Sequence, residues 1–553
     1  MPGAAETVDV PGRVAGPPTA GTHSDVLIVG AGPVGLVCAL LLGRRGWRVT
    51  VLERWPEPYA QPRAVHFDDE VARLLADAGI SDQIGRLTEP ADVYEWRNGE
   101  QQTLLRFDYA GAGPSGWPLA SMMHQPGLED ALREAAASAE GLSVLSGHEA
   151  MALTEGEEQV EVVARDAAGE QHAFTAAWVV GCDGANSFLR AKMPTEMTDL
   201  GFFFDWLIVD IVPNEARTWD PTNLQICDPQ RPTTVVSSGP GRRRWEFMRM
   251  PGEVVDDLNR EETAWQRLAP WGMTPDTCTL ERHAIYTFQA RWTDQWRCGR
   301  LLLAGDSAHL MPPFAGQGMC SGIRDAANLS WKLDLVLRGL ARDELLDTYT
   351  SERSAHVQHA IGMSVELGKV ICVTDPEQAA QRDAFMISQG ADPTRILPPL
   401  PPSTLTTGVV HRTAGGEPAP GAGVLTPQPR LTYRGRTGLL DDVVGSGLLL
   451  VCTEDPQASL EDDQQAFLDS VGAHVLHVLP AGASGTSSAD EAIDVDGAFL
   501  AYLAEGGYVA ALIRPDHYLF GAATSMSELP ELVSDLRGQL SIPRSADLST
   551  SST

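Results

Sequence analysis

Three glycines near the N-terminus have the spacing needed to hold a phosphate group. Gly30, Gly32 and Gly35 follow a short apolar run at 26–29 and lead into an apolar, helix-like segment at 36–42. In such a turn the first glycine permits the tight bend, the second lets the backbone approach a pyrophosphate, and the third lets the helix pack on the strand. The helix N-terminus then offers N–H groups and the positive end of its dipole to the phosphates.

An acidic residue completes this first motif. A second strand, predicted at 49–52, ends at Glu53, which lies 18 residues after Gly35 and is followed by Arg54. An acid at about this position accepts hydrogen bonds from a ribose in dinucleotide-binding folds. An incidental glycine-rich turn would explain the glycines but not strand, helix, second strand and acid in this order. We therefore predict a dinucleotide-binding βαβ unit over residues 25–54.

A second set of residues, later in the chain, could bind the other end of the same molecule. Gly305 and Asp306 end an apolar strand, and a carboxylate there can accept hydrogen bonds from ribityl hydroxyls or simply cap the next turn. Pro312 and Pro313 fix the backbone beside it and remove two N–H donors. The turn 316–318 then presents backbone N–H groups at a helix start, where the negative charge of a reduced flavin is favoured. Together the two segments predict an FAD site.

Length and composition indicate a soluble globular enzyme with two or three domains. The chain has 553 residues, 43% hydrophobic and 21% charged, and a chain of this length exceeds a single core. The formal net charge of −33 argues against nucleic acid and anionic membranes as partners. No apolar run reaches the roughly 18 residues that a membrane-spanning helix needs. Residues 1–24 lack the apolar core of a signal peptide, so we expect a cytoplasmic protein.

Neither the cysteines nor the histidines are spaced for metal binding. The eight cysteines contain no CxxC pair, which favours reduced thiols over a disulfide framework or a zinc site. His356 and His359 fall on one helix face but lack an HExxH frame. We therefore predict no metal centre. A flavin-linked disulfide reductase is also disfavoured, because no cysteine pair follows the first βαβ unit.

Patterns along the chain predict the α/β fold class, with a Rossmann-like FAD-binding domain, an inserted α+β substrate domain and a separate C-terminal domain. Trp245, Phe247 and Arg249 alternate with Glu246 and Met248, which predicts a sheet with one wet or ligand-facing side. The expected segments are a disordered tail (1–24), the first part of the FAD-binding domain with inserted hairpins (25–190), the substrate-binding sheet (191–290), the second part of the FAD-binding domain with long helices (291–373), a linker (374–431), the C-terminal domain (432–541) and a disordered tail (542–553).

The order of these motifs is similar to that of the class A, single-component FAD-dependent aromatic monooxygenases of the para-hydroxybenzoate hydroxylase fold. The resemblance is carried by GAGPVG with Glu53-Arg54, by Gly181-Cys182-Asp183-Gly184, and by Gly305-Asp306 followed by Pro-Pro and GQGM. Further segments resemble the 3-(3-hydroxyphenyl)propionate and 3-hydroxycinnamate hydroxylases in particular, namely 62–64, 68–70, 206–211, 227–232 and 247–253. Arg514-Pro515-Asp516 with Tyr518 resembles their C-terminal thioredoxin-like domain, which here contains only Cys452, lacks CxxC and is expected to be structural.

The resemblance implies which residues bind the cofactor. Asp183 and Gly184 match a motif that serves both FAD and the nicotinamide cofactor, and Arg63 and Gln125 would line the pyrophosphate side. The complete set assigned to cofactor binding is Gly30, Gly32, Pro33, Gly35, Glu53, Arg54, Arg63, Gln125, Asp183, Gly184, Gly305, Asp306, Pro313, Gly316, Gln317, Gly318 and Met319.

The resemblance also implies the reaction. NADH or NADPH reduces FAD, O2 is captured as a C4a-hydroperoxide, and one oxygen atom is transferred to a phenol ring, with the flavin supplying the difficult chemistry. The protein must exclude water, and a general base near the ring hydroxyl would favour the more reactive phenolate. His66 is our candidate for this base, although a packing histidine would give the same sequence pattern.

The expected partner is a small phenolic molecule. The favoured substrate is 3-(3-hydroxyphenyl)propanoate, hydroxylated ortho to its ring hydroxyl. Arg244, Arg249 and Arg291 are candidate partners for its carboxylate, but each could equally lie at the surface. The alternative is the same chemistry on a larger aromatic polyketide or antibiotic. A homodimer is the assembly considered, and no nucleic acid or membrane partner is expected.

Overall fold

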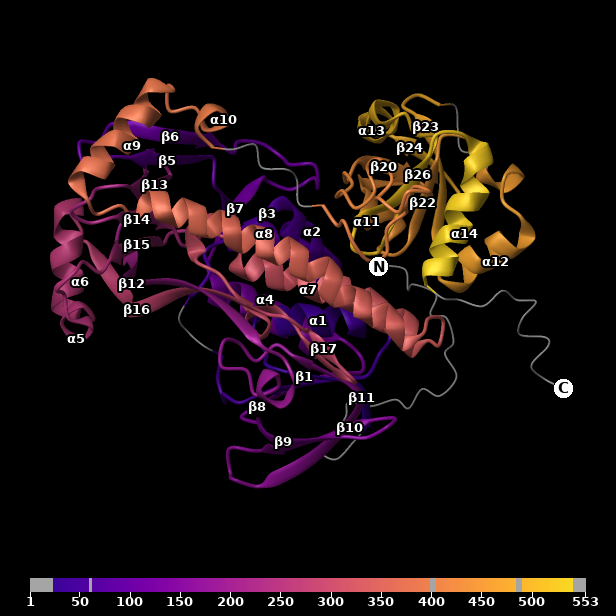
Figure 1. Ribbon diagram of the computed structural model, residues 1–553, viewed down its shortest axis with the longest axis horizontal. Helices are drawn as coiled ribbons and strands as arrows, with labels where there is room; N and C mark the ends of the chain where they lie inside the picture. The colour runs from indigo at the N-terminus through magenta and orange to yellow at the C-terminus, as the bar shows by residue number, and fades with distance from the viewer. Residues whose placement is uncertain (1–22, 59–61, 398–403, 484–489, 541–553) are drawn as a thin grey trace.

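The computed structural model describes residues 23–58, 62–397, 404–483 and 490–540 (Figure 1). The tails expected at 1–24 and 542–553 lie outside these ranges, apart from His23 and Ser24, which begin the first strand. Figure 1 shows a central domain built around the βαβ unit, a large second sheet on one side of it, and a C-terminal domain on the other.

The central sheet contains the βαβ unit that the glycine spacing predicts. β1 (His23–Val29), α1 (Pro33–Gly43) and β2 (Val49–Glu53) lie where strand, helix and strand were expected, so this prediction is confirmed. β1 pairs in parallel with β2 and with β11 (Gln171–Gly181), and β11 pairs with β18 (Leu301–Leu303). The strand order is β17-β18-β11-β1-β2-β8, with β17 at Arg297–Cys298 and β8 at Leu142–Ser146.

Long helices cover this sheet. α7 (Gly318–Leu337) packs against α1, and α8 (Asp347–Ile371) runs beside α7 across the middle of the molecule (Figure 1). α4 (Gln125–Ser138) also packs on α1. The helices expected after residue 318 are therefore confirmed. Among the helices in the described ranges, none combines the length and apolarity needed to cross a membrane.

The second sheet provides a wall of a large cavity. In the described residues its strand order is β19-β16-β12-β15-β14-β13-β5-β6. The strands are β5 (Val93–Arg97), β6 (Thr103–Asp108), β12 (Met197–Pro213), β13 (Asn223–Ile226), β14 (Thr233–Ser237), β15 (Arg243–Met248), β16 (Cys278–Thr293) and β19 (His309–Leu310). Trp245 and Phe247 pack in a core with α6 (Glu261–Leu268), whereas Glu246 lines the cavity on the opposite face. The predicted alternation of faces is confirmed.

Smaller elements connect these two sheets. A three-stranded sheet has the order β3-β7-β4, and two short helices lie between β3 and β4 in the chain. These elements are β3 (His66–Asp68), β4 (Thr88–Pro90), β7 (Ala120–Met123), α2 (Asp69–Leu75) and α3 (Ser81–Leu87). A hairpin of β9 (Glu149–Glu155) and β10 (Val160–Arg165) extends from β11 at the lower edge of Figure 1.

Two boundaries differ from the expected ones. The second sheet is not confined to residues 191–290, because β5 pairs in parallel with β13 and brings β6 with it. The expected linker at 374–431 contains α9 (Pro376–Ser388) and α10 (Pro393–Ile396). Each helix is capped by the aspartate before it and begins with proline, whose missing N–H is harmless at the first helical position. Pro376 and Pro393 therefore mark helix starts within the expected linker.

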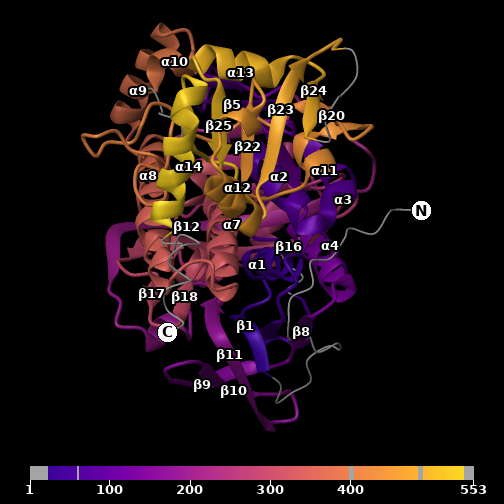
Figure 2. The ribbon, with the colours of Figure 1, turned by 90° about the vertical axis from the view of Figure 1, so that its right-hand side faces the viewer.

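The C-terminal domain has its own sheet and core. Its strand order is β21-β20-β24-β23-β22-β25-β26, and Figure 2 shows it in front of α7. The strands are β20 (Arg430–Tyr433), β21 (Arg436–Leu439), β22 (Leu449–Cys452), β23 (His474–Pro480), β24 (Glu491–Asp494), β25 (Ala510–Ile513) and β26 (Leu519–Ala523). Helices α12 (Asp462–Ser470) and α14 (Leu529–Gln539) cover one face, and α13 (Ala498–Gly506) covers the other. The likeness of this domain to thioredoxin stays a prediction.

Candidate active site

A cavity of about 770 Å³ lies between the central domain and the second sheet. It runs from the glycine turn, past the loop before β3, to the loop that begins α7. Residues assigned to the cofactor from the sequence that line it are Gly32, Pro33, Arg63, Gln125, Gly184, Asp306, Pro313, Gly316, Gln317, Gly318 and Met319. His66 lines it too. Segments far apart in the chain are thus brought to one site.

The glycines of the first turn divide into two roles. Gly30 has φ 104°, and a Cβ added there would collide with the carbonyl of Cys182. A Cβ added at Gly35 would collide with the carbonyl of Gly30. By contrast, a Cβ added at Gly32 would meet nothing within 4 Å. Gly30 and Gly35 therefore permit close backbone packing, and Gly32 leaves room for a phosphate.

Glu53 lies beside the glycine turn but outside the cavity lining. Its two oxygens accept hydrogen bonds from the backbone N–H groups of Ala31 (2.9 Å) and Trp55 (3.0 Å). Arg54 is exposed, and its guanidinium carbon lies 5.0 Å from the ring centroid of Trp55. The contacts place Glu53 next to the turn, while its role toward a ribose and that of Arg54 toward the cofactor stay predictions.

Gln125, the first residue of α4, fixes the loop on the opposite side of the cavity. Its Oε1 accepts hydrogen bonds from the backbone N–H groups of Arg63 (3.0 Å) and Ala64 (2.7 Å). Its Nε2 donates to Glu129, at 2.7 Å. Gln125 therefore holds the backbone of the Arg63 loop in place and leaves the arginine side chain to face the cavity.

Arg133 is a residue that the sequence analysis missed. It lies on α4 with Gln125 and Glu129 at intervals of four, so all three share one helix face. Its Nη2 donates to the carbonyl of Ala31 in the glycine turn at 3.0 Å, and its buried Nε finds no acceptor within the described residues. The polar stripe on α4 was a signal that could have identified it.

The carboxylate of Asp183 forms hydrogen bonds within its own turn. Its carboxylate accepts hydrogen bonds from the hydroxyl of Ser187 (2.5 Å) and the N–H of Leu189 (3.0 Å), and burial raises its pKa. Gly184 lines the cavity but Asp183 does not. A role of this pair toward the nicotinamide cofactor stays a prediction.

Asp306 is available to a ligand. It is exposed, lines the cavity, and forms no hydrogen bond through its carboxylate to any described residue. Gly305 before it has φ 64° and donates its N–H to the buried Asp325, at 3.0 Å. Asp325 also accepts from His309, at 2.7 Å. His309 is thus a structural residue, and this network holds the turn that exposes Asp306.

His66 lies against the loop that begins α7. A Cβ added at Gly316 would come within 2.9 Å of the Nδ1 atom of His66, and this buried nitrogen has no hydrogen-bond partner among the described residues. Burial lowers the pKa of His66, so its imidazole is neutral near pH 7. A neutral imidazole on the cavity wall could accept a proton, and its catalytic role stays a prediction.

Of the three arginines considered for a substrate carboxylate, only Arg244 reaches the cavity. Arg244 is occupied, because its Nε donates to buried Asp210 at 2.7 Å and its other nitrogens donate to backbone carbonyls of the Arg63 loop. Arg249 pairs with Asp205 at 2.9 Å, and Arg291 pairs with Asp199 at 2.8 Å, both away from the cavity. None of the three is free to bind a substrate carboxylate.

Arg282 and Glu246 are the charged cavity residues that the sequence analysis did not identify. Arg282 is 3% exposed, and its Nε and Nη2 atoms find no acceptor among the described residues. Glu246 makes no hydrogen bond within the described part of the chain, its nearest cation is Arg244 at 3.7 Å, and burial raises its pKa. Both side chains face the cavity from the second sheet.

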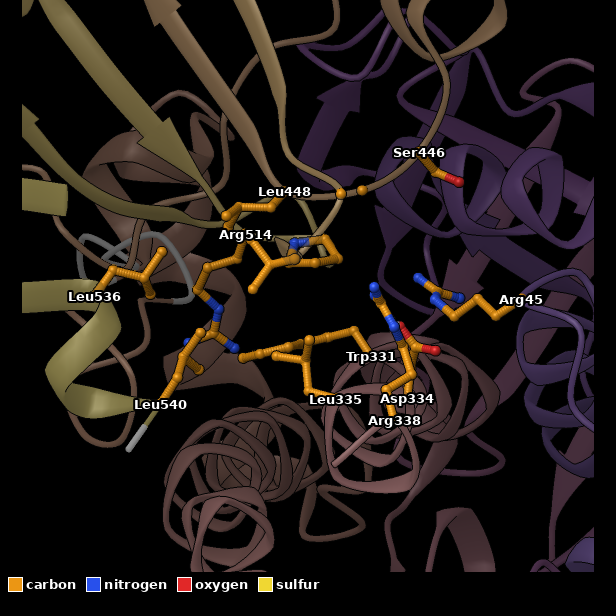
Figure 3. A pocket seen from close by; sticks show the side chains of 14 residues that line it. Arg45, Trp331, Asp334, Leu335, Arg338, Ser446, Leu448, Arg514, Leu536 and Leu540 are labelled. Carbon is orange, nitrogen blue, oxygen red and sulfur yellow. The ribbon is translucent and has the colours of Figure 1, made fainter. Parts of the chain in front are cut away.

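A second, smaller cavity of about 180 Å³ lies between α7 and the C-terminal domain (Figure 3). Trp331 and Asp334 line it from α7, and Leu448 and Leu536 line it from the C-terminal domain. The guanidinium carbon of Arg514 lies 5.2 Å from the ring centroid of Trp331. No residue assigned to the cofactor lies here, so this cavity is separate from the candidate active site.

The fold and the larger cavity define an FAD-binding enzyme with a separate second sheet beside the cavity. The open space at Gly32 and the unoccupied carboxylate of Asp306 fit the two ends of FAD. A family model described as FAD binding domain matches residues 23–364, and one described as HcaD C-terminal domain matches residues 423–539. The chain belongs to the FAD-dependent aromatic monooxygenases of class A, which use a nicotinamide cofactor as reductant and O2 as co-substrate.

Individual relatives extend over almost the whole chain. The probable NADH-specific resorcinol 4-hydroxylase of Rhodococcus jostii (strain RHA1) is 38% identical over 528 residues, covering 94% of this chain and 96% of that protein. The 3-(3-hydroxy-phenyl)propionate/3-hydroxycinnamic acid hydroxylase of Comamonas testosteroni is 32% identical over 560 residues, covering 91% and 94%. The crystal structure of the flavin-dependent monooxygenase PieE with FAD and substrate has a TM-score of 0.77 at 22% identity, covering 95% of this chain and 100% of that chain. The last comparison shows the shared fold.

Proposed function

We propose that this monooxygenase hydroxylates a single-ring phenol carrying a second polar group meta to its hydroxyl, at the carbon ortho to that hydroxyl. The favoured substrate is 3-(3-hydroxyphenyl)propanoate, which would become 3-(2,3-dihydroxyphenyl)propanoate. Arg282 is the observation that carries this proposal, because its side chain lines the cavity and two of its buried nitrogens have no acceptor among the described residues. A buried donor without a partner costs about 1–3 kcal/mol, and a substrate carboxylate would supply acceptors for both nitrogens.

FAD would occupy the opposite side of the cavity. Its pyrophosphate would lie near Gly32 and Arg63, its ribityl chain would donate to Asp306, and its ring system would lie along Pro313 and residues 316–319. Bound FAD supplies the redox chemistry. The remaining tasks, which are orienting the phenol, accepting its proton and excluding water, fall to the residues of this chain.

His66 would accept the phenol proton. Its lowered pKa leaves the imidazole neutral and able to act as a base at pH 7. Water exclusion would depend on an aromatic wall in which Phe314 meets Trp206 and Phe288, with ring centroids 5.7 Å apart in both pairs. Phe314 and Phe288 line the cavity, and an apolar wall of this kind keeps solvent from the reacting atoms.

Resorcinol is the second candidate substrate, and Glu246 favours it. The free carboxylate of Glu246 could accept a hydrogen bond from a second ring hydroxyl, whereas it would repel a substrate carboxylate nearby. The Rhodococcus relative is named as a resorcinol 4-hydroxylase. The two candidates differ in charge, so they predict different anchoring residues.

The test is a comparison of four phenols in coupled NAD(P)H oxidation and product analysis: 3-(3-hydroxyphenyl)propanoate, its methyl ester, resorcinol and a larger polycyclic phenol. If Arg282 anchors the acid, the methyl ester should lose about 2–5 kcal/mol of binding, the usual effect of breaking a buried charge pair. Arg282→Met should weaken the acid and spare resorcinol. Arg291→Met, the same change at the partly exposed pair with Asp199, is the control.

Equal turnover of acid and ester would reject the carboxylate anchor. If resorcinol is then hydroxylated and Glu246→Gln weakens it, resorcinol becomes the substrate. Conversion of only the polycyclic phenol would reject both single-ring candidates and favour the antibiotic-type substrate.

A further inference from the structure

One turn of the C-terminal domain is buried against the FAD-binding domain. This junction turn, residues 514–518, joins β25 to β26, and Arg514, Asp516, His517 and Tyr518 are each at most 4% exposed. The same residues carried the sequence resemblance of this domain, yet none of them lines the active-site cavity. Any influence on the active site must therefore pass through neighbouring residues.

Three of these side chains fasten the junction by direct contacts with α7, α8 and the segment after α2. The contacts join Arg514 to Glu352 (2.7 Å), Asp516 to Asn328 (2.9 Å) and His517 to Asp77 (2.6 Å). These contacts account for the attachment of the domain, and none of them continues to a residue of the cavity wall.

Tyr518 differs because its partner belongs to a chain of contacts that ends at the cavity. The Tyr518 hydroxyl donates to Oε1 of Glu70 at 2.8 Å. The other oxygen of Glu70 accepts from Nε of Arg324, on α7, at 2.6 Å. Glu70 and Arg324 are buried, 5% and 8% exposed, so Glu70 depends on Arg324 and Tyr518 for its side-chain hydrogen bonds.

Arg324 connects this pair to the start of α7. Its Nη2 donates to Asp68 at 2.7 Å and its Nη1 donates to Oε1 of Gln317 at 2.8 Å. Gln317 also donates to Asp68, at 3.1 Å. Asp68 and Gln317 both line the cavity, and Gln317 lies in the 316–318 loop assigned to the flavin. All three guanidinium nitrogens of Arg324 therefore donate hydrogen bonds, Nε to Glu70 and the other two to residues of this wall.

The network contains one cation, Arg324, and two carboxylates, those of Asp68 and Glu70. Burial opposes ionisation of Arg324, but Asp68 and Glu70 outweigh it and raise the pKa of Arg324 well above its ordinary value. Burial alone would raise the pKa of Asp68, but Arg324 lowers it. One buried cation thus serves two carboxylates, and the Tyr518 hydroxyl offsets part of the negative charge of Glu70.

We propose that Tyr518 is a positioning residue for the flavin: through Glu70 it fixes Arg324, and Arg324 fixes Asp68 and Gln317 at the flavin-binding loop. The C-terminal domain thereby influences the electrostatic potential at the flavin without contacting it. This inference rests on the proposed placement of FAD along residues 316–319.

Tyr518→Phe in the FAD-loaded enzyme is the principal test, because the ring still fills its site and only the hydroxyl is lost. Without that donor, Glu70 should draw Arg324 away from Asp68, and the flavin edge should become more negative. We expect reduced FAD to bind about tenfold more weakly relative to oxidised FAD, which corresponds to a reduction potential about 30 mV more negative for a two-electron couple. The measurement is a spectroscopic redox titration.

Two further variants sharpen the test. Glu70→Gln removes one negative charge from the same network, so the potential should move in the opposite direction, to a more positive value. Tyr502→Phe is the matched control, since this tyrosine lies on α13 of the same domain and stacks on Phe499 at 5.9 Å, away from the junction. The control should keep the wild-type potential.

A wild-type potential in both network variants would overturn the proposal, even if their stability falls, because the junction turn would then be only a structural attachment. If Tyr518→Phe does not fold, the reduction potential of Glu70→Gln alone decides: a wild-type value rejects the proposal. Asp306→Ala separates this failure from an error in the FAD placement: retention of FAD by that variant would reject the placement itself.

Discussion

Asp183 and Asp306 show how two aspartates at one active site acquire different roles. Both oxygens of Asp183 are occupied by Ser187 and Leu189, so this carboxylate stabilises its own turn. Asp306 lies on an exposed turn and its carboxylate has no hydrogen-bond partner among the described residues. Of the two carboxylates, only that of Asp306 is therefore available to a ligand, and its role toward FAD stays a prediction.

Asp306→Ala should release FAD. Loss of hydrogen bonds from ribityl hydroxyls to a charged acceptor weakens binding by about 1.5–3 kcal/mol each, which is enough to empty the site during gel filtration. Flavin fluorescence before and after the column measures the loss. Asp199→Ala, a partly exposed aspartate outside the cavity, should stay yellow. Full retention of FAD by the Asp306 variant would remove this residue from the ribityl role.

His66→Gln should abolish an acid limb in the pH profile of kcat. Burial lowers the pKa of His66 below its ordinary value of 6.5. The imidazole is therefore a neutral base at pH 7 and becomes protonated only as the pH falls through this lowered pKa. Activity of the wild type should therefore fall toward acid. The kcat of the variant should be about 10²–10⁴-fold lower, as expected for removal of a general base. Its pH profile should be flat over the acid range in which the wild type loses activity. An unchanged acid limb in the variant would assign it to another group.

The sequence indicated which face of the second sheet meets the cavity, but it could not show which arginine keeps nitrogens without an acceptor. Asp210 lies opposite Arg244 on β15 and opposite Arg282 on β16. Its hydrogen bonds go to Arg244, and Arg282 approaches it only to 3.9 Å. Alternation along a strand sets the face of a side chain, whereas this pairing depends on the register between three strands. Arg282 was therefore not identifiable beforehand.

At the scale of elements, predictions succeeded where a local pattern determines the structure. The βαβ unit was predictable because β1 is buried on both faces and is therefore a continuous apolar run. α9 and α10 were missed because proline is common both in loops and at the first position of a helix. β5 was missed because its partner, β13, lies far along the chain. Contacts between distant segments leave no local signal.

Cys452→Ala should leave kcat unchanged. Cys452 lies in β22, is fully buried, and burial raises its pKa to about 12, so its thiol is not ionised near pH 7. Cys452→Ser should also keep kcat but should lose stability, because a buried hydroxyl without a partner costs about 1–3 kcal/mol. Thermal unfolding and steady-state rates separate the two effects. A large fall in kcat with an unchanged Tm would instead give the thiol a part in turnover.

At the scale of the whole molecule, the junction between domains is built from buried ions. Glu352 of α8 contacts Arg514 at 2.7 Å and Lys332 at 2.9 Å, and all three side chains are fully buried. Burial would raise the pKa of Glu352, but the two cations outweigh it and lower the pKa to about 2. The attachment of the C-terminal domain therefore depends on this carboxylate being ionised.

The junction should weaken in acid. Because the pKa of Glu352 falls from 4.5 to about 2 on folding, its stabilisation is present above pH 4.5 and is lost as the pH falls toward 2. The full loss is roughly 3 kcal/mol. Hydrogen exchange of residues 514–518 at pH 5 and pH 3 would measure it. Glu366→Gln, on the exposed part of the same helix, should behave as wild type.

Glu352→Gln supplies the complementary measurement. It should be less stable at neutral pH, because Arg514 and Lys332 lose their common counter-charge. It should also lose less protection than the wild type between pH 5 and pH 3. Equal acid sensitivity in both proteins would place the titrating group elsewhere.

The strand order of the central sheet also determines when the flavin site can form during synthesis of the chain. β11 pairs with β18, although five strands of the second sheet, β12 to β16, are synthesised between them. A nascent chain that has emerged only as far as β11 carries the glycine turn but has neither β18, Asp306 nor the 316–318 loop. During translation the first half of the flavin site is therefore present before β18 has been made, and the edge of β11 that will pair with β18 is still unpaired. Flavin captured after β18 arrives would favour the closed sheet over its open precursor.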